Sequence, residues 1–312
     1  DVIEQGATFP GDAEEAVEEL DRLLRRSVKR RMIADVPVGA FLSGGIDSTA
    51  VVAIAQQVAS DTVKTFTIGS PARDYDESSD ARLVAAELGT DHTELVVTDA
   101  DALRVVEQLG VIHDEPFADS SQIPTRLVSE LARRDVTVAL SGDGGDELFR
   151  GYNRYAWVPS IWRQLERVPL SLRRRGGSVI EAIPPTKWDQ CARLIPASRR
   201  PRLVGVKMGK VAAVADAQSV YEVYHRLVSH WRDPTALVRG STEPLTLHTN
   251  KSQMPKVSGI VDHMSAVDAV TYLPDDILCK VDRAAMSVSL ECRIPLFDRR
   301  ILQFAASLPA DF

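Results

Sequence analysis

Residues 36–48 read Val-Pro-Val-Gly-Ala-Phe-Leu-Ser-Gly-Gly-Ile-Asp-Ser, and this stretch decides the fold. The apolar run at 36–42 predicts a short buried strand with the proline at its beginning. The strand leads into the small, polar segment 43–48, and residues 49–59 then predict a helix rich in small side chains. A buried strand that passes through a glycine-rich turn into a helix is typical of α/β proteins.

The same alternation continues to about residue 150. Apolar and β-branched runs predict three more strands, at 63–68, 92–97 and 136–140. Helical spacing of apolar residues predicts helices at 12–34, 76–88, 99–112 and 122–134. Asp12 is expected to cap the first of these helices, and Gly89 to end the second. Strands that alternate with helices predict a parallel twisted sheet with helices on both faces.

The character of the sequence changes after residue 150. Arginine, proline and tryptophan become more frequent, and no convincing strand pattern follows. Pro-marked turns separate segments that look helical. We therefore divide the chain into an α/β portion at 1–150 and a mostly helical portion at 151–312.

Composition narrows the class of protein. The chain has 312 residues, a net charge of −7 and three cysteines, Cys191, Cys279 and Cys292. The acidic balance argues against a nucleic-acid binder, and no apolar run is long enough to predict a membrane span. Without a CxxC pair, a disulfide framework or structural zinc site is not expected, which fits a cytoplasmic protein.

The loop at 43–48 predicts an anion site at the end of its strand. Two glycines allow backbone amides to face a concavity, and the following helix turns its positive end toward it. Ser43 and Ser48 add hydroxyl donors. The loop lacks the lysine of a Walker A motif, so it is a different kind of phosphate loop.

Carboxylates beside this anion site indicate a divalent cation. Asp47 would repel a phosphate unless a cation lay between them, and Mg²⁺ prefers carboxylates, phosphate oxygens and water. A second glycine-rich loop, Ser-Gly-Asp-Gly-Gly-Asp-Glu at 141–147, follows another predicted strand. We expect Asp47 and Asp146 to hold one Mg²⁺ between them.

Four segments together resemble one enzyme family. The segment 43–48 resembles the pyrophosphate loop of the PP-loop ATP-pyrophosphatases, and 141–152 resembles the second signature of asparagine synthetases. The segments 273–283 and 291–298 resemble later parts of the same synthetase domain. The chain thus looks like the C-terminal synthetase domain of the glutamine-hydrolysing asparagine synthetases, whose fold is of the adenine nucleotide alpha hydrolase type.

The resemblance implies an ATP-dependent ligase that forms amides. ATP activates the side-chain carboxylate of aspartate as an acyl-adenylate, pyrophosphate leaves, and ammonia attacks to give asparagine and AMP. Asp47 and Asp146 would bind Mg²⁺, and Asp143, Tyr152 and Lys280 would act near the reacting groups; many members have Glu at the position of Asp143. The implied nucleotide site consists of Leu42, Ser43, Gly44, Gly45, Asp47, Ser48, Ile68, Ser141 and Gly142.

Some assignments stay open at this stage. Lys280 and Arg283 would assist phosphate or carboxylate binding, or else pair with Asp276 and Asp282 along a helix. The polar loop at 113–121 would approach the site or be a solvated loop. The same adenylation of another carboxylate, as in β-lactam synthetase or in polysaccharide and antibiotic amidotransferases, is an alternative, and a catalytically weak nucleotide-binding module is another.

The family also sets expectations about what surrounds this domain. Glutamine-dependent members begin with a glutaminase domain that has an N-terminal cysteine nucleophile, whereas the first cysteine here is Cys191. We expect such a domain in the full-length parent, and a lysine-bearing segment after residue 312. Expected partners are small molecules, namely the carboxylate and ammonia, with no nucleic acid and no membrane; a homodimer is a candidate assembly.

Overall fold

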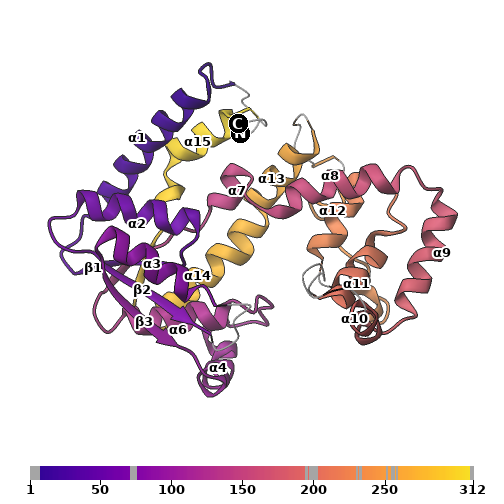
Figure 1. Cartoon of the computed structure of the whole chain (residues 1–312), viewed down its shortest axis with the longest axis horizontal. Coiled ribbons are helices and arrows are strands. Elements are labelled where there is room, and N and C mark those ends of the chain that lie inside the picture. Colours follow the sequence, from indigo (N-terminus) through magenta and orange to yellow (C-terminus); the bar gives the residue numbers. More distant parts are fainter. Residues whose placement is uncertain are drawn as a thin grey trace. The chain divides into compact units, whose positions relative to one another are not determined.

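The computed structural model describes residues 8–70, 76–193, 196, 203–229, 231, 234–250, 252–253, 257 and 259–309. The chain forms two compact units (Figure 1). The first consists of Asp1–Gly151 together with Asp268–Phe312, and the second of Tyr152–Val267. The division predicted from sequence ended the first portion at residue 150, whereas in the structure the described residues from Asp268 onward also group with it.

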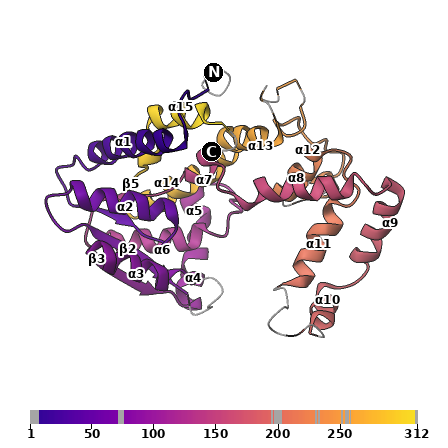
Figure 2. The same ribbon diagram turned by 45° about the horizontal axis from the view of Figure 1, so that its top comes forward.

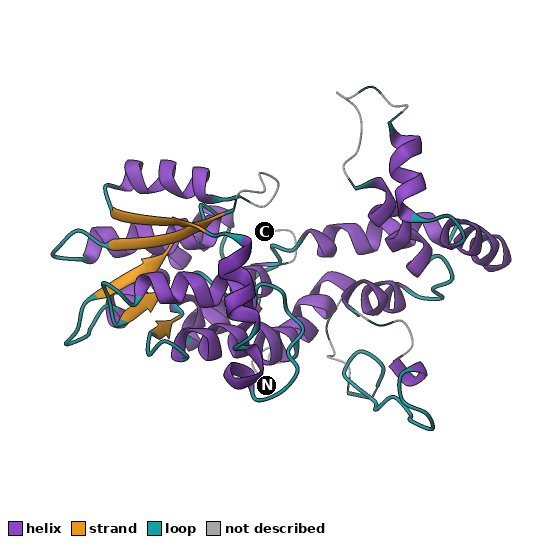
Figure 3. Cartoon of the chain, turned by 90° about the horizontal axis from the view of Figure 1, so that it is seen from below, coloured by secondary structure: helices purple, strands orange, loops and turns teal. Residues whose placement is uncertain are grey.

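A five-stranded parallel sheet forms the centre of the first unit. The strands are β1 (Val38–Phe41), β2 (Lys64–Gly69), β3 (Asp91–Val96), β4 (Val138–Leu140) and β5 (Glu291–Arg293). Their order is β3-β2-β1-β4-β5, and all neighbours are parallel. Figure 3 shows the strands grouped together, with the rest of the described chain helical or in loops. The predicted α/β class and parallel sheet are therefore confirmed.

Helices cover both faces of this sheet, as predicted (Figures 1 and 2). One core joins strand residues such as Ala40 and Leu140 to α1, α2, α3 and α15, and the other joins Phe66 and Ala139 to α6 and α14. The helices of this unit are α1 (Ala13–Arg31), α2 (Ile46–Val58), α3 (Ser78–Leu88), α4 (Asp99–Val106), α5 (Leu109–His113), α6 (Gln122–Ala132), α7 (Gly145–Phe149), α14 (Cys279–Met286) and α15 (Arg299–Ser307).

Local sequence signals explain several helix ends. Asp12 caps α1 and forms a capping box with Glu15, as the sequence predicted. Gly89 ends α3 in the left-handed conformation at φ 66°, which glycine adopts without strain. The single helix predicted at 99–112 is instead two helices, α4 and α5, because the chain turns at 107–108.

The fifth strand corrects the expectation that strands end at residue 150. β5 contains only three residues, too few for a periodic pattern, and it exists because its backbone pairs with β4. The Ser141 amide donates to the Arg293 carbonyl at 2.9 Å, and the Glu291 amide donates to the Thr137 carbonyl at 2.9 Å. The C-terminal segment therefore extends the sheet on the side of β4.

The described secondary-structure elements of the second unit are helices. The unit contains α8 (Asn153–Leu165), α9 (Leu170–Glu181), α10 (Pro185–Ala192), α11 (Val204–Val214), α12 (Val220–Val228) and most of α13 (Ile260–Val270). Tyr155, Val158, Tyr224, Met264 and Val267 lie in its own apolar core. Among the described residues of the chain, no helix is long and apolar enough to cross a membrane.

Candidate nucleotide site

The two glycine-rich loops follow neighbouring strands at the point where the strand order reverses. From β1 the chain adds β2 and β3 on one side, and it later returns to place β4 on the other side of β1. Ligands of open α/β sheets bind outside the carboxyl ends of the strands at such a switch point. The loop after β1 at 42–45 and the loop after β4 at 141–144 both begin there.

Hydroxyl groups fix the shape of the first loop. The Ser43 and Ser48 hydroxyl oxygens lie 3.0 Å apart, and the Ser48 hydroxyl donates to the Gly45 carbonyl at 3.2 Å. The Ser43 amide donates to the Ser48 hydroxyl at 3.3 Å. Gly44 has φ 80°, and a Cβ there would lie 2.8 Å from the Ala81 backbone, so only glycine fits. The loop thus leads into α2 with its N-terminus open to the site.

Glycines of the second loop let the two loops interlock. A Cβ on Gly142 would lie 2.6 Å from the Ser48 amide nitrogen, and a Cβ on Gly145 would lie 2.2 Å from the Asp47 carboxylate. The second loop therefore packs directly on the start of α2. The structure brings both predicted loops into one site, with Asp47 lying over the start of α7.

Asp47 lies in a region of concentrated negative charge. Burial raises its pKa, and the nearby charges of Asp146 and then Asp143 raise it further, to about 6. A divalent cation among these carboxylates would relieve this repulsion, so the residues fit the predicted Mg²⁺. The described residues contain no group of three or more metal-ligating side chains arranged as a cage. An ion here would therefore also need oxygens from the nucleotide or from water.

The residues expected at the adenosine lie on adjacent strand ends. Leu42 follows β1 and is buried, and its amide donates to the Phe66 carbonyl of β2 at 3.0 Å. Ile68 lies near the end of β2 and is half-buried, while Ser141 follows β4. The Ser141 hydroxyl donates to the Asp143 carboxylate at 2.5 Å. Three neighbouring strands thus present these groups at the same edge of the sheet.

Lys280 forms an ion pair that the sequence did not predict. Its ammonium group lies 2.8 Å from the Asp119 carboxylate and 2.7 Å from the Ser121 hydroxyl. The side chains are 8% and 17% exposed for Lys280 and Asp119. Burial alone would raise the pKa of Asp119, but the hydrogen bonds from Lys280 and Ser121 outweigh burial and lower the pKa to about 2. The Asp119 carboxylate is therefore ionised at neutral pH.

The predicted pairing of Lys280 and Arg283 with Asp276 and Asp282 along their helix is wrong. Lys280 bonds Asp119 rather than Asp276, and Arg283 bonds the Asp114 carboxylate at 3.2 Å rather than Asp282. Both cations of α14 thus hold the loop at 113–121. In that loop the His113 ring stacks on Phe117 with centroids 4.5 Å apart, and burial lowers its pKa.

The remaining predicted residues divide between the two units. Asp146 lies against Gly151, where a Cβ would come 2.2 Å from the carboxylate. Tyr152 is the first residue of the second unit, and its ring contacts Tyr155 and the Arg154 guanidinium there.

The sequence did not predict that Asp119 and Ser121 bind Lys280 of α14, nor that the carboxylate of Glu147 is buried. Glu147 is 2% exposed in α7, directly after the predicted ligand Asp146. Asp119 and Ser121 belong to a loop that the sequence marked as polar, but a pairing over about 160 residues leaves no local pattern. Apart from the apolar residues that follow Glu147, nothing in the neighbouring sequence predicts that its side chain is buried.

Comparisons with known proteins agree with the geometry. Residues 19–312 match the family model described as asparagine synthase. The chain is 31% identical over 298 residues to asparagine synthetase [glutamine-hydrolyzing] 1 of Bacillus subtilis, covering 96% of this chain and 44% of the relative. It is 33% identical over 298 residues to a putative asparagine synthetase [glutamine-hydrolyzing] of Mycobacterium bovis, covering 94% and 42%.

A solved structure of an NH3-dependent NAD synthetase from Campylobacter jejuni covers 67% of this chain and 98% of its own, at 14% identity and a TM-score of 0.32. That likeness is too weak to add to the argument. The chain spans less than half the length of these two relatives. The matched model covers nearly the whole chain, and the chain belongs to the asparagine synthase family.

Proposed function

We propose that this chain carries out the synthetase half-reactions of an ATP-dependent amide-forming ligase. The interlocked loops after β1 and β4, with Asp47 held among other carboxylates, are the observation that carries this proposal. The names of the relatives favour aspartate as the carboxylate substrate and asparagine as the product. Because these relatives are more than twice as long, the activity of a whole enzyme is part of the proposal.

The chemistry has two steps. In the first, a carboxylate oxygen of aspartate attacks the α-phosphorus of ATP, the bond to the bridging oxygen breaks, and pyrophosphate leaves. In the second, ammonia attacks the acyl carbon, loses a proton, and AMP departs as a far better leaving group than hydroxide. Both steps develop negative charge on phosphate oxygens, which a preorganised site can stabilise.

Residues of the first unit have separate roles in this scheme. The amides of Gly44 and Gly45, the hydroxyls of Ser43 and Ser48 and the positive end of α2 would bind the pyrophosphate. Asp47 and Asp146 would hold Mg²⁺, which supplies positive charge to the leaving phosphates. The strand ends at Leu42, Ile68, Ser141 and Gly142 would bind the adenosine.

Two further residues are proposed to act on the acyl side, and a third to position the loop at 113–121. Asp143 follows Ser141 in the second loop, where it would take part in the adenylation step. Tyr152 begins the second unit and would contact the acyl group. Lys280 serves best as a positioning residue, because both of its hydrogen bonds go to the loop at 113–121.

Isotope transfer gives a direct test. Aspartate with ¹⁸O in its side-chain carboxylate should pass one ¹⁸O atom to AMP when incubated with ATP, Mg²⁺ and ammonium, and asparagine should appear in equal amount. Formation of ADP, or of AMP without label, would contradict the acyl-adenylate route.

A panel of other carboxylates distinguishes the substrate. Pyrophosphate release with aspartate well above that with other acids supports asparagine formation. If another acid is preferred and passes its ¹⁸O to AMP, the adenylation chemistry stands and the choice of aspartate is wrong. Tight Mg-ATP binding without pyrophosphate release would support the nucleotide-binding module instead.

A further inference from the structure

A hollow of about 810 Å³ lies among α4, α5, α6 and α14, which are labelled in Figure 2. Its described lining residues come from the stretch 107–112, from Arg126 of α6 and from the stretch 282–287. All of them belong to the first unit, and none is among the residues assigned to the nucleotide site. A hollow of this volume is large enough for a small molecule.

Arg126 presents a buried guanidinium to this hollow. The residue is 8% exposed, and its Nη1 donates to the Glu130 carboxylate at 3.0 Å. Its Nε is buried without a hydrogen-bond partner, and Nη2 has no partner among the described residues. Buried donors in proteins are nearly always bonded, so an acceptor is expected at this edge of the guanidinium.

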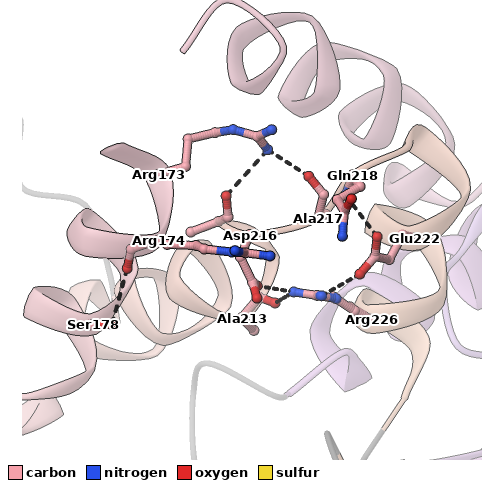
Figure 4. Close-up of polar contacts among 10 residues, drawn as sticks. Arg173, Arg174, Ser178, Ala213, Asp216, Ala217, Gln218, Glu222 and Arg226 are labelled. Atoms are coloured by element: carbon pink, nitrogen blue, oxygen red, sulfur yellow. Dashed lines mark hydrogen bonds and ion pairs between the residues drawn. The ribbon is translucent and has the colours of Figure 1, made fainter. Parts of the chain in front are cut away.

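Arg226 of the second unit shows the usual arrangement for a half-buried arginine (Figure 4). Its Nη1 donates to the Ala213 carbonyl at 3.0 Å and pairs with Asp216, while its Nη2 pairs with Glu222. Both terminal nitrogens are therefore bonded within the protein. In Arg126, which is more deeply buried, only one of them is.

Positive charge exceeds negative charge at the Arg126 wall. The Glu130 carboxylate is shared, because the Arg104 guanidinium also lies 3.1 Å from it. Arg283 adds another guanidinium, and its carboxylate partner, Asp114, is largely exposed. Solvent weakens ion pairs of that kind, so this wall can attract an anionic group.

The rest of the lining combines carboxylates with apolar side chains. Glu107 and Asp282 are exposed, and neither forms an ion pair within the described part of the chain. They share the hollow with Arg126 but do not pair with it. Val111 and Met286 contribute exposed apolar surface beside them. A ligand that carries both charges and an apolar part would meet all of these groups.

We propose that the hollow binds a zwitterion with an apolar side chain, of the class of α-amino acids and short peptides. Its carboxylate would accept hydrogen bonds from Nε and Nη2 of Arg126, a geometry that guanidinium groups favour. Its ammonium group would pair with Glu107 or Asp282, and its side chain would lie on Val111 and Met286. A simple anion would leave the carboxylates unpaired, and a simple amine would leave Arg126 without its acceptor.

Such a ligand would act on the loop at 113–121. Arg283 of α14 holds the start of this loop by donating to the His113 carbonyl at 2.9 Å. α5 ends at His113 and forms another wall of the hollow. Because the ligand would join α5 to α14, we expect amide hydrogen exchange at 109–121 to slow when it binds.

Calorimetry on the full chain without nucleotide tests the ligand class. We expect leucine or leucyl-leucine to bind saturably at one site, and the tighter of the two shows whether a free amino acid or a peptide is preferred. Leucinamide and N-acetylleucine, which lack one charge each, should bind at least tenfold more weakly. Absence of binding at about 10 mM of both zwitterions would overturn the proposal. Equal affinity for leucine and leucinamide would show a site for amines and refute it.

Substitutions locate the site. Arg126→Lys keeps the positive charge but removes the planar edge of the guanidinium, and it should weaken binding at least tenfold. The double variant Glu107→Gln, Asp282→Asn should do the same by removing the partners of the ammonium group.

Two control variants change the same groups outside the hollow. Arg133→Lys follows α6 and Asp99→Asn begins α4, and both residues are exposed. These controls should bind like the parent. Parent-like affinity in both hollow variants would place the ligand elsewhere and refute the site. If Arg126→Lys fails to fold by circular dichroism, the double variant decides, because it changes only exposed side chains.

Discussion

At the scale of single residues, Asp47 connects the electrostatics of the site to its proposed ligand. Its pKa is raised from 3.8 to about 6, so ionising it costs more in the folded chain than in the unfolded one. Without metal, folding stability should therefore fall as the pH rises from about 4 to 6 and stay reduced at neutral pH. At pH 7.5 the free energy of unfolding of Asp47→Asn should exceed that of the parent by about 1 kcal/mol after solvent screening, so the variant should unfold at a higher temperature. At pH 4 the two proteins should unfold at nearly the same temperature.

Magnesium pyrophosphate should reverse this order. The parent should be stabilised by the ligand at pH 7.5, whereas Asp47→Asn should gain little, as thermal unfolding and calorimetry would measure. Asp61→Asn is the matched control, because Asp61 is exposed in the loop before β2. Equal stabilisation of Asp47→Asn and the parent would refute the metal role.

Lys280 allows a second prediction at this scale. Lys280→Met leaves the Asp119 carboxylate buried without its cation, which should cost about 3–5 kcal/mol at pH 7. The pKa of Asp119 is lowered by folding, so its ionised form stabilises the parent above about pH 4, and this stabilisation is lost as the pH falls toward 2. The difference in stability between the variant and the parent should therefore shrink in acid. Adding Asp119→Asn should restore part of the loss in urea unfolding. No restoration would show that the pair is not the cause.

At the scale of elements, the interlocking of two loops requires glycine at particular positions. Gly145→Ala keeps a residue that suits helix α7, but its Cβ would push the Asp47 carboxylate aside. We expect Mg-ATP affinity to fall at least tenfold while the circular dichroism spectrum stays unchanged. Gly209→Ala in α11 is the control: its Cβ meets nothing within 4 Å, and it should raise stability by up to about 1 kcal/mol. Unchanged affinity in Gly145→Ala would contradict the interlocked arrangement.

At the scale of the whole molecule, the C-terminal segment completes the first unit. Leu290 and Ala285 lie in one core of that unit, and Leu296, Ile301 and Phe304 lie in the other. In a chain that ends at Val267, the first unit should therefore fail to fold, although it keeps its first four strands. The lost burial exceeds the few kcal/mol by which domains are stable. Slow amide hydrogen exchange retained in β1, β2 and β4 of the truncated chain would contradict this expectation.

The sequence alone determined the features that depend on near neighbours along the chain. Local sequence patterns predicted four of the five strands and the two loops with Asp47 and Asp146, because a strand or a glycine turn is recorded within a few residues. They also predicted the helices of the first 134 residues, apart from the turn that divides 99–112 into α4 and α5. The motifs in their order also led to the family, which the comparisons confirm.

Only the tertiary structure decided which distant segments meet. The three-residue strand β5, the contact of Gly145 with Asp47 and the pairing of Lys280 with Asp119 join parts of the chain that are far apart in sequence. Such contacts depend on strand order and on how the cores close, and one residue at each end gives no periodic signal. Local pattern therefore fixed what the elements are, and long-range packing fixed which side chains they bring together.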